Sequence, residues 1–279
     1  MLRICYDLSH SPPTYDAVAS ACIAERWRIT RGEPNIEIAI APGPREGFRG
    51  GENYWPYGRE AREGALENIA IPIFQLLPSC TSVYRLGRHE DARGMLVAAH
   101  GLRNQIYAGV RPLRLNRTFV QHPDLVTITL READHWPTRN SNVPEWIKAA
   151  SGMQQMGLRV VFVRDTLCAA KRIDGFEIDA LAAVDLPERA VLYASARINI
   201  GVNNGPMWLA AAMDVPTVIM RPLDAVAPCC NAAYFKRCGI SDQTGAVPGM
   251  SNVRIGWGPD TAENILGEVS AAMGVPCAA

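Results

Sequence analysis

The chain lacks the features that mark nucleic-acid-binding, membrane-spanning or secreted proteins. Its 28 Lys and Arg balance 28 Asp and Glu, and they are scattered, so no basic surface for nucleic acid is predicted. No apolar run approaches the roughly 20 residues that cross a membrane. The start of the sequence shows no basic region followed by a long apolar core, so we expect no signal peptide and a cytoplasmic protein.

Familiar catalytic and metal motifs are also missing. The eight cysteines show no metal-type spacing, so we expect buried thiols and no bound metal. The sequence contains no serine-hydrolase elbow, no His-Glu-x-x-His and no Asp-x-Asp motif. With 48% hydrophobic and 20% charged residues, the composition is that of a globular protein with one long domain or two.

What the chain does contain is an alternation of strand and helix patterns. Strands are expected at 2–6, 36–41, 83–86, 125–130, 159–164 and 198–202, and helices at 15–29, 59–66 (or to 70), 92–107, 142–156, 176–183, 190–194 and 261–273. Such alternation predicts parallel sheets covered on both faces. A polar segment before residue 125 suggests two domains, 1–120 and 121–279.

Two helix starts in the second half carry carboxylates in capping patterns. Glu145 stands three residues after Asn142, which predicts a capping box for the helix that follows. Asp260 precedes the last helix and is the expected cap there, with Glu263 three residues later.

The most informative segment is Ile198–Met220, which predicts a buried strand, a polar turn, a helix and a second buried strand. Asn203 or Asn204 is placed to cap the helix, and Pro206 in its first turn has no N–H to leave unpaired. Gly205 allows the backbone to approach a ligand closely. Free N–H groups at the carboxyl edge of a strand favour an anion, so this turn predicts a phosphate site.

This segment resembles the donor-binding signature of the heptosyltransferase-like glycosyltransferases (glycosyltransferase family 9), which have the GT-B fold. The matching positions are Gly201, Val202, Gly205, Pro206, Met207, Leu209 to Ala212, Val215, Pro216 and Thr217. Asn203 stands where the family has Asp, and Trp208 where it has His. The resemblance implies that Asn203 and the backbone from Asn204 to Met207 hold the donor diphosphate. A generic strand–turn–helix would also account for the apolar positions.

A second similarity lies in Trp136-Pro137, followed by Trp146 on the next helix. In the family a lysine two residues before this Trp-Pro pair helps to neutralise the donor phosphates, but Asp134 occupies that position here. Arg131 and Arg139 are the available substitutes, since a guanidinium can bind phosphate with two donors. Both arginines also fit structural roles as solvated residues or in ion pairs.

A third similarity lies at the amino-terminal end. In the family an Asp at the opening of the first helix is the expected general base on the acceptor hydroxyl, and Asp16 is the nearest counterpart. Asp7 and His10 are rivals because both lie closer to the end of the first strand. An acidic residue in the first turn of a helix also has a purely structural explanation.

The resemblance implies an α/β protein with two facing Rossmann-like domains of GT-B type and a reduced amino-terminal domain. Residues 1–120 would form the acceptor side and residues 121–279 the donor-binding domain. The implied reaction is inverting transfer of a sugar from a nucleotide-activated donor to a glycan or other hydroxyl acceptor, without metal or further cofactor.

Two alternatives remain open at this point. One is a glycosyltransferase-like binding protein without catalysis, which the departures at Asn203, Trp208 and Asp134 favour. The other is a nucleotide-sugar epimerase or hydrolase on the same scaffold. The sequence leaves the donor sugar, the nucleotide base, the acceptor and the oligomeric state undetermined.

Overall fold

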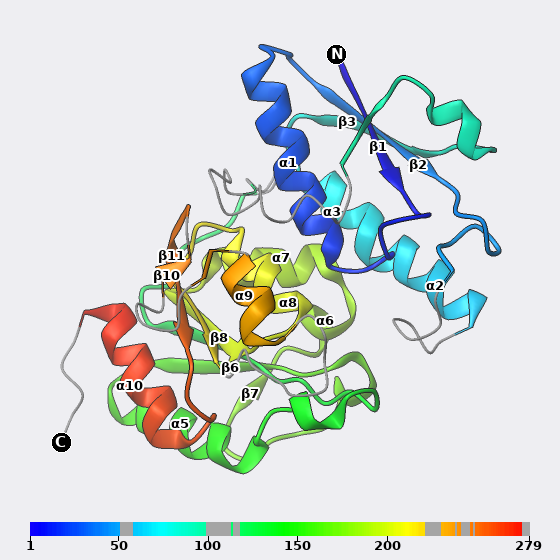
Figure 1. Ribbon diagram of the computed structural model, residues 1–279. Coiled ribbons are helices and arrows are strands. Elements are labelled where there is room, and N and C mark those ends of the chain that lie inside the picture. The colour runs from blue at the N-terminus through cyan, green and yellow to red at the C-terminus, as the bar shows by residue number, and fades with distance from the viewer. Residues whose placement is uncertain are drawn as a thin grey trace. The chain divides into compact units, whose positions relative to one another are not determined.

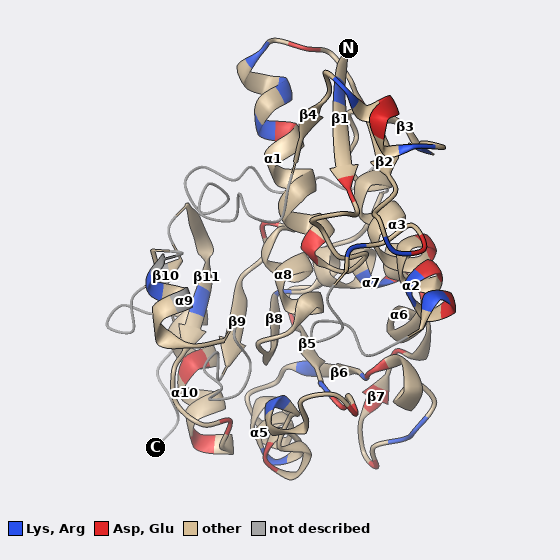
Figure 2. Ribbon diagram, turned by 45° about the vertical axis from the view of Figure 1, so that its right-hand side comes forward, with Lys and Arg blue, Asp and Glu red and all other residues tan. Residues whose placement is uncertain are grey.

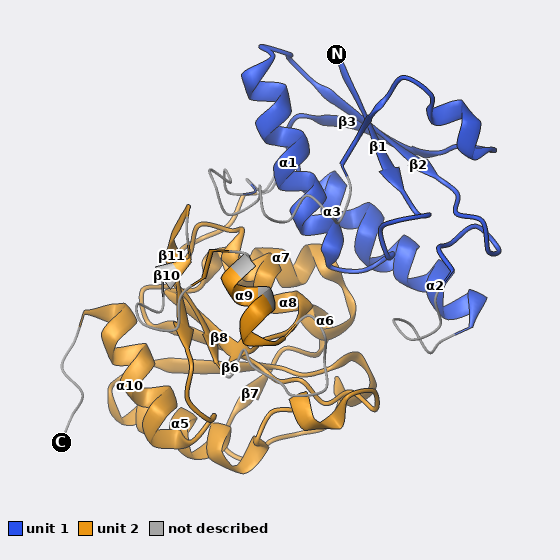
Figure 3. Ribbon diagram, in the orientation of Figure 1, with its two compact units in different colours: residues 1–116 blue, residues 117–279 orange. Residues whose placement is uncertain are grey.

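The computed structural model describes residues 1–50, 58–98, 113, 118–220, 230–237, 239–240, 246–247 and 249–274. The chain forms two compact units, Met1–Asn116 and Arg117–Ala279 (Figure 3). The division lies four residues before the boundary expected from the sequence. Among the described residues, no helix is long and apolar enough to cross a membrane.

Unit 1 is a small parallel sheet with helices (Figure 1). Its strands are β1 (Leu2–Asp7), β2 (Ile36–Ala41), β3 (Cys80–Arg85) and β4 (Leu96–Val97), and its helices are α1 (Asp16–Thr30), α2 (Arg59–Ala65) and α3 (Ile71–Gln75). The strand order is β3-β2-β1-β4, with parallel pairing throughout. A π-helical segment, Leu66–Ala70, joins α2 to α3, so helical structure continues beyond the predicted end.

Unit 2 is built on a larger sheet. Its strands are β5 (Leu125–Thr129), β6 (Arg159–Val163), β7 (Glu177–Ile178), β8 (Ile198–Val202), β9 (Thr217–Met220), β10 (Ala246–Val247) and β11 (Met250–Gly256). Its helices are α5 (Val143–Gln155), α6 (Ala180–Val184), α7 (Leu186–Ser195), α8 (Gly205–Ala211), α9 (Ala232–Arg237) and α10 (Ala262–Met273). The strand order is β10-β11-β9-β8-β5-β6-β7, and only the pairing of β10 with β11 is antiparallel in this described sheet.

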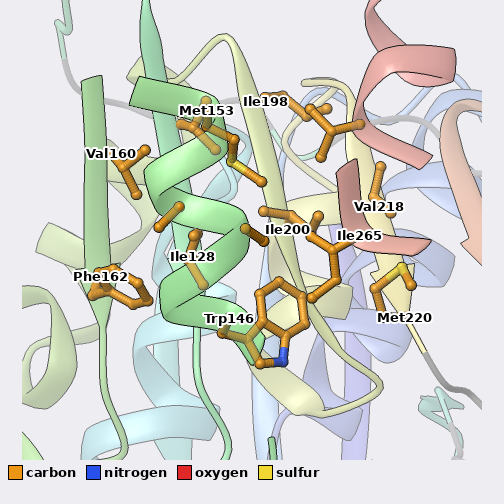
Figure 4. Close-up of a cluster of buried hydrophobic side chains, with 14 of the residues drawn as sticks. Ile128, Trp146, Met153, Val160, Phe162, Ile198, Ile200, Val218, Met220 and Ile265 are labelled. Atoms are coloured by element: carbon orange, nitrogen blue, oxygen red, sulfur yellow. The ribbon is translucent and has the colours of Figure 1, made fainter. Parts of the chain in front are cut away.

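Successive side chains of β5 are buried on opposite faces of this sheet. Val126 and Ile128 belong to an apolar core that includes Trp146 of α5 and Ile265 of α10 (Figure 4). The intervening Thr129 is buried too, and its hydroxyl is hydrogen-bonded to the Tyr193 hydroxyl of α7 at 2.7 Å. Since successive side chains of a strand point to opposite faces, β5 contacts different helices on its two sides.

The prediction for the two carboxylate caps is wrong, because each carboxylate accepts from the start of the other helix. Asp260 accepts a hydrogen bond from Asn142 N at the start of α5 (2.8 Å), whereas Glu145 of α5 accepts one from Ala262 N at the start of α10 (2.9 Å). The cap of α10 is Thr261, whose hydroxyl accepts from Asn264 N. The start of α10 is thus satisfied by a carboxylate of α5, and the start of α5 by a carboxylate that lies just before α10.

Other predicted elements need correction. The segment 176–183 is not one helix, because Glu177–Ile178 pairs with β6 and the helix starts at Ala180, capped by Asp179. The helix expected at 92–107 is also wrong at its start, where Leu96–Val97 pairs with β1. Residues 99–107 lie outside the described part of the chain.

Candidate functional site

Unit 2 reverses its strand order between β5 and β8. The chain runs from β5 outward to β6 and β7, and then returns to the other side of β5 to form β8 and β9. In open parallel sheets, the loops that follow the two strands at such a reversal diverge and leave a ligand-binding crevice at the carboxyl edge. In this unit those loops are the segment after β5, from Leu130 to Asn142, and the turn after β8, from Asn203 to Gly205.

The loop after β5 is closed at its base by paired hydrogen bonds. Arg131 N donates to the Ser141 hydroxyl and Ser141 N donates to Arg131 O, each at 2.9 Å. One step further, the Asn140 side chain accepts from Ala133 N at 3.1 Å and donates to Ala133 O at 2.9 Å. These contacts fix the loop's two ends against each other, so its tip has a defined place beside β8.

The Arg131 guanidinium makes hydrogen bonds within the same loop. The residue is 5% exposed and donates to Trp136 O at 3.0 Å, to His135 O at 2.6 Å and to the side chain of Asn140. A guanidinium that satisfies three acceptors of its own loop is held in one orientation. The structure therefore gives Arg131 a positioning contact within the loop.

The loop tip contains a strained residue. Trp136 has φ +50° and ψ +62°, the left-handed region that bulky side chains rarely adopt. Its carbonyl accepts from both Arg131 and Arg139 N, and its ring lies 5.6 Å from the Arg139 guanidinium carbon. These contacts hold the backbone in a conformation that would otherwise cost free energy.

The Arg139 side chain connects this loop to the turn after β8. Its Nη2 donates to Asn203 O at 2.8 Å. Within the described part of the chain, this contact uses one of the five N–H donors of a guanidinium. Arg139 thus places a half-buried cation where the two loops of the strand reversal meet.

The turn itself is built as the sequence predicts, with Asn204 as the cap. Its side chain accepts from Met207 N at 3.0 Å, and Gly205 and Pro206 are the first two residues of α8. Asn203 is buried, and its Oδ1 accepts from the indole N–H of Trp208 at 3.0 Å. The two residues that depart from the family signature are therefore hydrogen-bonded to each other, and neither side chain ionises.

Gly201 explains how the turn approaches β5 so closely. A Cβ at this position would lie 2.6 Å from Thr129 O and 2.8 Å from the sulfur of Met207. A side chain there would push α8 away from the carboxyl end of β5. Glycine is thus required for the packing beneath the turn.

His135 lies close enough to the two arginines for their charges to affect its titration. Burial and the positive charges of Arg131 and Arg139 lower its pKa below the ordinary value, and Asp165 opposes the shift. The imidazole is therefore neutral near pH 7. The two arginines thus disfavour a further positive charge at His135.

A cavity of about 380 Å³ borders the same edge of the sheet, beside β9. It is lined by Met220, the last residue of β9, by Arg254 of β11, and by Asn264 and Glu268 of α10. Its volume is within the range of small-molecule sites. It provides mixed polar and apolar walls between the ends of β9 and β11 and helix α10.

Unit 1 holds the residues considered as proton acceptors. Asp16 is the first residue of α1, and its carboxylate accepts from the Thr14 hydroxyl at 3.3 Å. Asp7 ends β1 and is 4% exposed. Its Oδ2 lies 3.1 Å from His10 Nδ1 and 3.1 Å from His89 Nε2. His89 is the residue that sequence reasoning missed, because 82 positions separate it from Asp7 and no local motif marks it.

The titration of Asp7 reflects these partners. Burial acts to raise its pKa, but hydrogen bonds from Ser9, His89 and His10 outweigh burial and lower it. Asp7 is therefore a carboxylate at neutral pH, stabilised by two imidazoles. Among the described residues, no group of three or more His, Cys, Asp or Glu is arranged to hold a metal ion.

Comparison with known proteins bears on the fold. No family model and no curated protein sequence matches the chain. Among solved structures, it is similar to ADP-heptose LPS heptosyltransferase II of E. coli, with a TM-score of 0.55, 12% identity and 98% of each chain covered. It is also similar to TibC, an iron-containing dodecameric glycosyltransferase of enterotoxigenic E. coli, with a TM-score of 0.51, 14% identity, and 98% of this chain and 76% of that chain covered.

At such low identity these similarities concern the fold alone. They agree with the two Rossmann-like units, the smaller sheet of unit 1 and the parallel pairing seen in both units. The predicted resemblance is thereby confirmed for the architecture: the chain is a divergent α/β protein with the GT-B-type fold of the heptosyltransferase-like glycosyltransferases.

Proposed function

We propose that the protein is a glycosyltransferase that moves a sugar from a nucleotide-activated donor to a hydroxyl acceptor. The observation that carries this proposal is the Arg139 guanidinium, held between the two loops of the strand reversal by its bond to Asn203 O. A diphosphate leaving group gains negative charge as the sugar departs, and a fixed cation at that place stabilises it.

The neighbouring groups fit the same ligand. The turn formed by Asn203 and Asn204 and the amide of Gly205 lie at the carboxyl end of β8, and we assign the backbone contacts to phosphate to the amides of Asn204 and Gly205. The amide of Met207 already donates to the Asn204 side chain. We assign the phosphate contact to Arg139, while Arg131 positions the loop through its three internal hydrogen bonds. The fold shared with heptosyltransferase II, whose name specifies an ADP-heptose donor, supports a nucleotide sugar as the ligand class.

The test is a thermal-shift screen of the full chain against ADP, GDP, UDP, CMP and their sugar conjugates. A ligand that binds only the native state raises the unfolding midpoint. We expect a selective shift with one nucleotide, and an affinity about 10- to 100-fold lower in Arg139→Met, from the loss of charge-assisted hydrogen bonds.

Arg159→Met is the matched control. Arg159 begins β6 at the opposite edge of the sheet and pairs with Glu177 on the surface, so its loss should leave the nucleotide shift unchanged. Absence of a shift with every nucleotide would contradict the proposal. For the nucleotide that binds, analysis of the sugar product separates transfer from hydrolysis and from epimerisation.

A further inference from the structure

Unit 1 repeats the strand reversal of unit 2. The chain runs from β1 to β2 and β3, and then crosses to the other side of β1 to form β4. The carboxyl end of β1 is therefore the predicted ligand-binding edge of this unit. The residue at that end is Asp7, and the segment before β4 contributes His89 beside it.

The backbone after β1 is fixed in a tight turn around this carboxylate. Asp7 Oδ1 accepts from Ser9 N at 2.8 Å, and Asp7 O accepts from His10 N at 3.1 Å and from Ser11 N at 2.8 Å. Arg49 donates to His10 O at 3.2 Å. His10 is thus anchored through its main chain as well as through its ring.

The hydrogen bonds at Asp7 favour one tautomer of each ring. Because an ionised carboxylate only accepts, its contacts favour a proton on Nδ1 of a neutral His10 and on Nε2 of a neutral His89. The Ser9 hydroxyl oxygen lies 2.7 Å from the same His10 Nδ1 and can accept from it as well. The lone pair of His10 is then on Nε2, at the far side of the ring from Asp7. The His10 side chain is 69% exposed, so this nitrogen is accessible to a substrate.

Resting on the function proposed above, we propose that His10 is the general base of the transfer, and that Asp7 is its positioning residue. The acceptor hydroxyl oxygen forms a bond to the anomeric carbon of the donor sugar, and the bond from that carbon to the diphosphate oxygen breaks. The nucleoside diphosphate leaves with the bonding electron pair. The hydroxyl proton passes to His10 Nε2, from which water removes it.

Asp16 is less suited to this step. It lies in the first turn of α1, where the helix N-terminus and the Thr14 hydroxyl stabilise its negative charge. His10 has the opposite arrangement, since the carboxylate behind it stabilises the protonated ring that forms in the transfer.

The first experiment determines the tautomers by ¹⁵N NMR of the histidine-labelled full chain. We expect His10 in the Nδ1–H form, the minor tautomer of free imidazole, and His89 in the Nε2–H form. Asp7→Asn should return His10 toward the Nε2–H form. A wild-type His10 in the Nε2–H form would overturn the assignment, and this measurement needs no substrate.

The second experiment measures release of nucleoside diphosphate from the nucleotide sugar identified in the screen. A positioned general base contributes about 10²- to 10⁴-fold, so kcat should fall by that factor in His10→Gln. Nucleotide binding should be retained. The effect should be smaller in His89→Gln and Asp16→Asn, and absent in His122→Gln, a control on an exposed histidine of unit 2.

The outcomes separate the two proposals. Full turnover by His10→Gln, in a protein whose wild type shows the nucleotide-induced shift, would overturn the His10 assignment alone. A loss of turnover in Asp16→Asn as large as in His10→Gln would also contradict it. Absence of any nucleotide-induced shift in the wild type would overturn the proposed function, and the assignment of His10 with it.

Discussion

The two units place histidine in opposite electrostatic surroundings at equivalent points of their sheets. In unit 2, the loop after the first strand puts His135 beside Arg131 and Arg139, and its pKa is lowered. In unit 1, His10 and His89 contact the buried carboxylate of Asp7. Lys and Arg are otherwise interspersed with Asp and Glu along the described elements of both units (Figure 2).

On the functions proposed above, one topology would support two chemistries. Both sheets start at an inner strand, grow to one side and then return to the other. The residues at the carboxyl edge then decide what each unit attracts: arginines and a neutral imidazole favour an anion, whereas a carboxylate with two imidazoles favours proton transfer. We expect the donor phosphates at unit 2 and the acceptor hydroxyl at unit 1.

The largest expected effect tests the packing beneath each edge. A Cβ at Gly43 would lie 2.3 Å from Phe48 C and 2.7 Å from Leu8 O, which are backbone atoms. At Gly201 one backbone atom, Thr129 O, and the flexible Met207 side chain are the obstacles. Overpacking typically costs about 1–3 kcal/mol, so we expect that cost for Gly201→Ala and more for Gly43→Ala.

Urea denaturation of both variants checks this order. The matched control is Gly267→Ala, at a helical position where a Cβ meets nothing within 4 Å; it should stabilise the protein by about 0.5–1 kcal/mol. Equal stability of Gly43→Ala and wild type would show that the turn after β2 is not tightly packed against the end of β1.

An effect of comparable size concerns the internal contacts of Arg131. Hydrogen bonds to a charged group contribute about 1.5–3 kcal/mol each, so Arg131→Met should lower the free energy of unfolding by about 3 kcal/mol or more. Arg139→Met removes one such contact with Asn203 and should cost less. If urea denaturation gave the reverse order, Arg139 rather than Arg131 would be the residue that holds the loop.

Asp7 should make unit 1 sensitive to acid. Its pKa is lowered in the folded protein, so its contribution to stability is complete above its ordinary value of 3.8 and is lost as the pH falls through the folded value. Asp7→Asn should therefore be less stable than wild type at about pH 6, and the difference should shrink below about pH 4. Urea midpoints across this range test the sign; a constant difference would contradict it.

The smallest effect is the pH response of His135. Because its pKa is lowered from 6.5, the unfolded chain binds more protons than the folded chain just below that pH. Wild-type stability should therefore fall as the pH drops from about 7.5 to 5.5. In His135→Gln the loss of stability due to this histidine should be absent. An unchanged pH dependence of stability in this variant would show that His135 does not cause the loss.

Local patterns in the sequence predicted the elements that depend on local interactions. The strand–turn–helix at β8 and α8 formed as expected, because Asn204, Gly205 and Pro206 act within one turn. The predicted GT-B-type architecture followed from the alternation of strands and helices and from the family resemblance, and the structural comparisons confirm it.

Features that depend on distant partners were not predictable. Glu145, in the first turn of α5, accepts from Ala262 N at the start of α10, and Asp260, just before α10, accepts from Asn142 N at the start of α5. More than 110 positions of sequence separate the partners. His89 reaches Asp7 across 82 positions. Arg131 turns into its own loop and donates to the carbonyl of Trp136, whose left-handed backbone is signalled by no residue type at that position.

The most direct test of the contrast between the two edges is hydrogen–deuterium exchange of the full chain with and without the nucleoside diphosphate selected by the screen. The account predicts added protection of the amides at 131–141 and 203–207 and none at 7–11, because the diphosphate binds at the edge formed by β5 and β8. Protection at 7–11 without protection at 203–207 would contradict it and would place the anion site in unit 1.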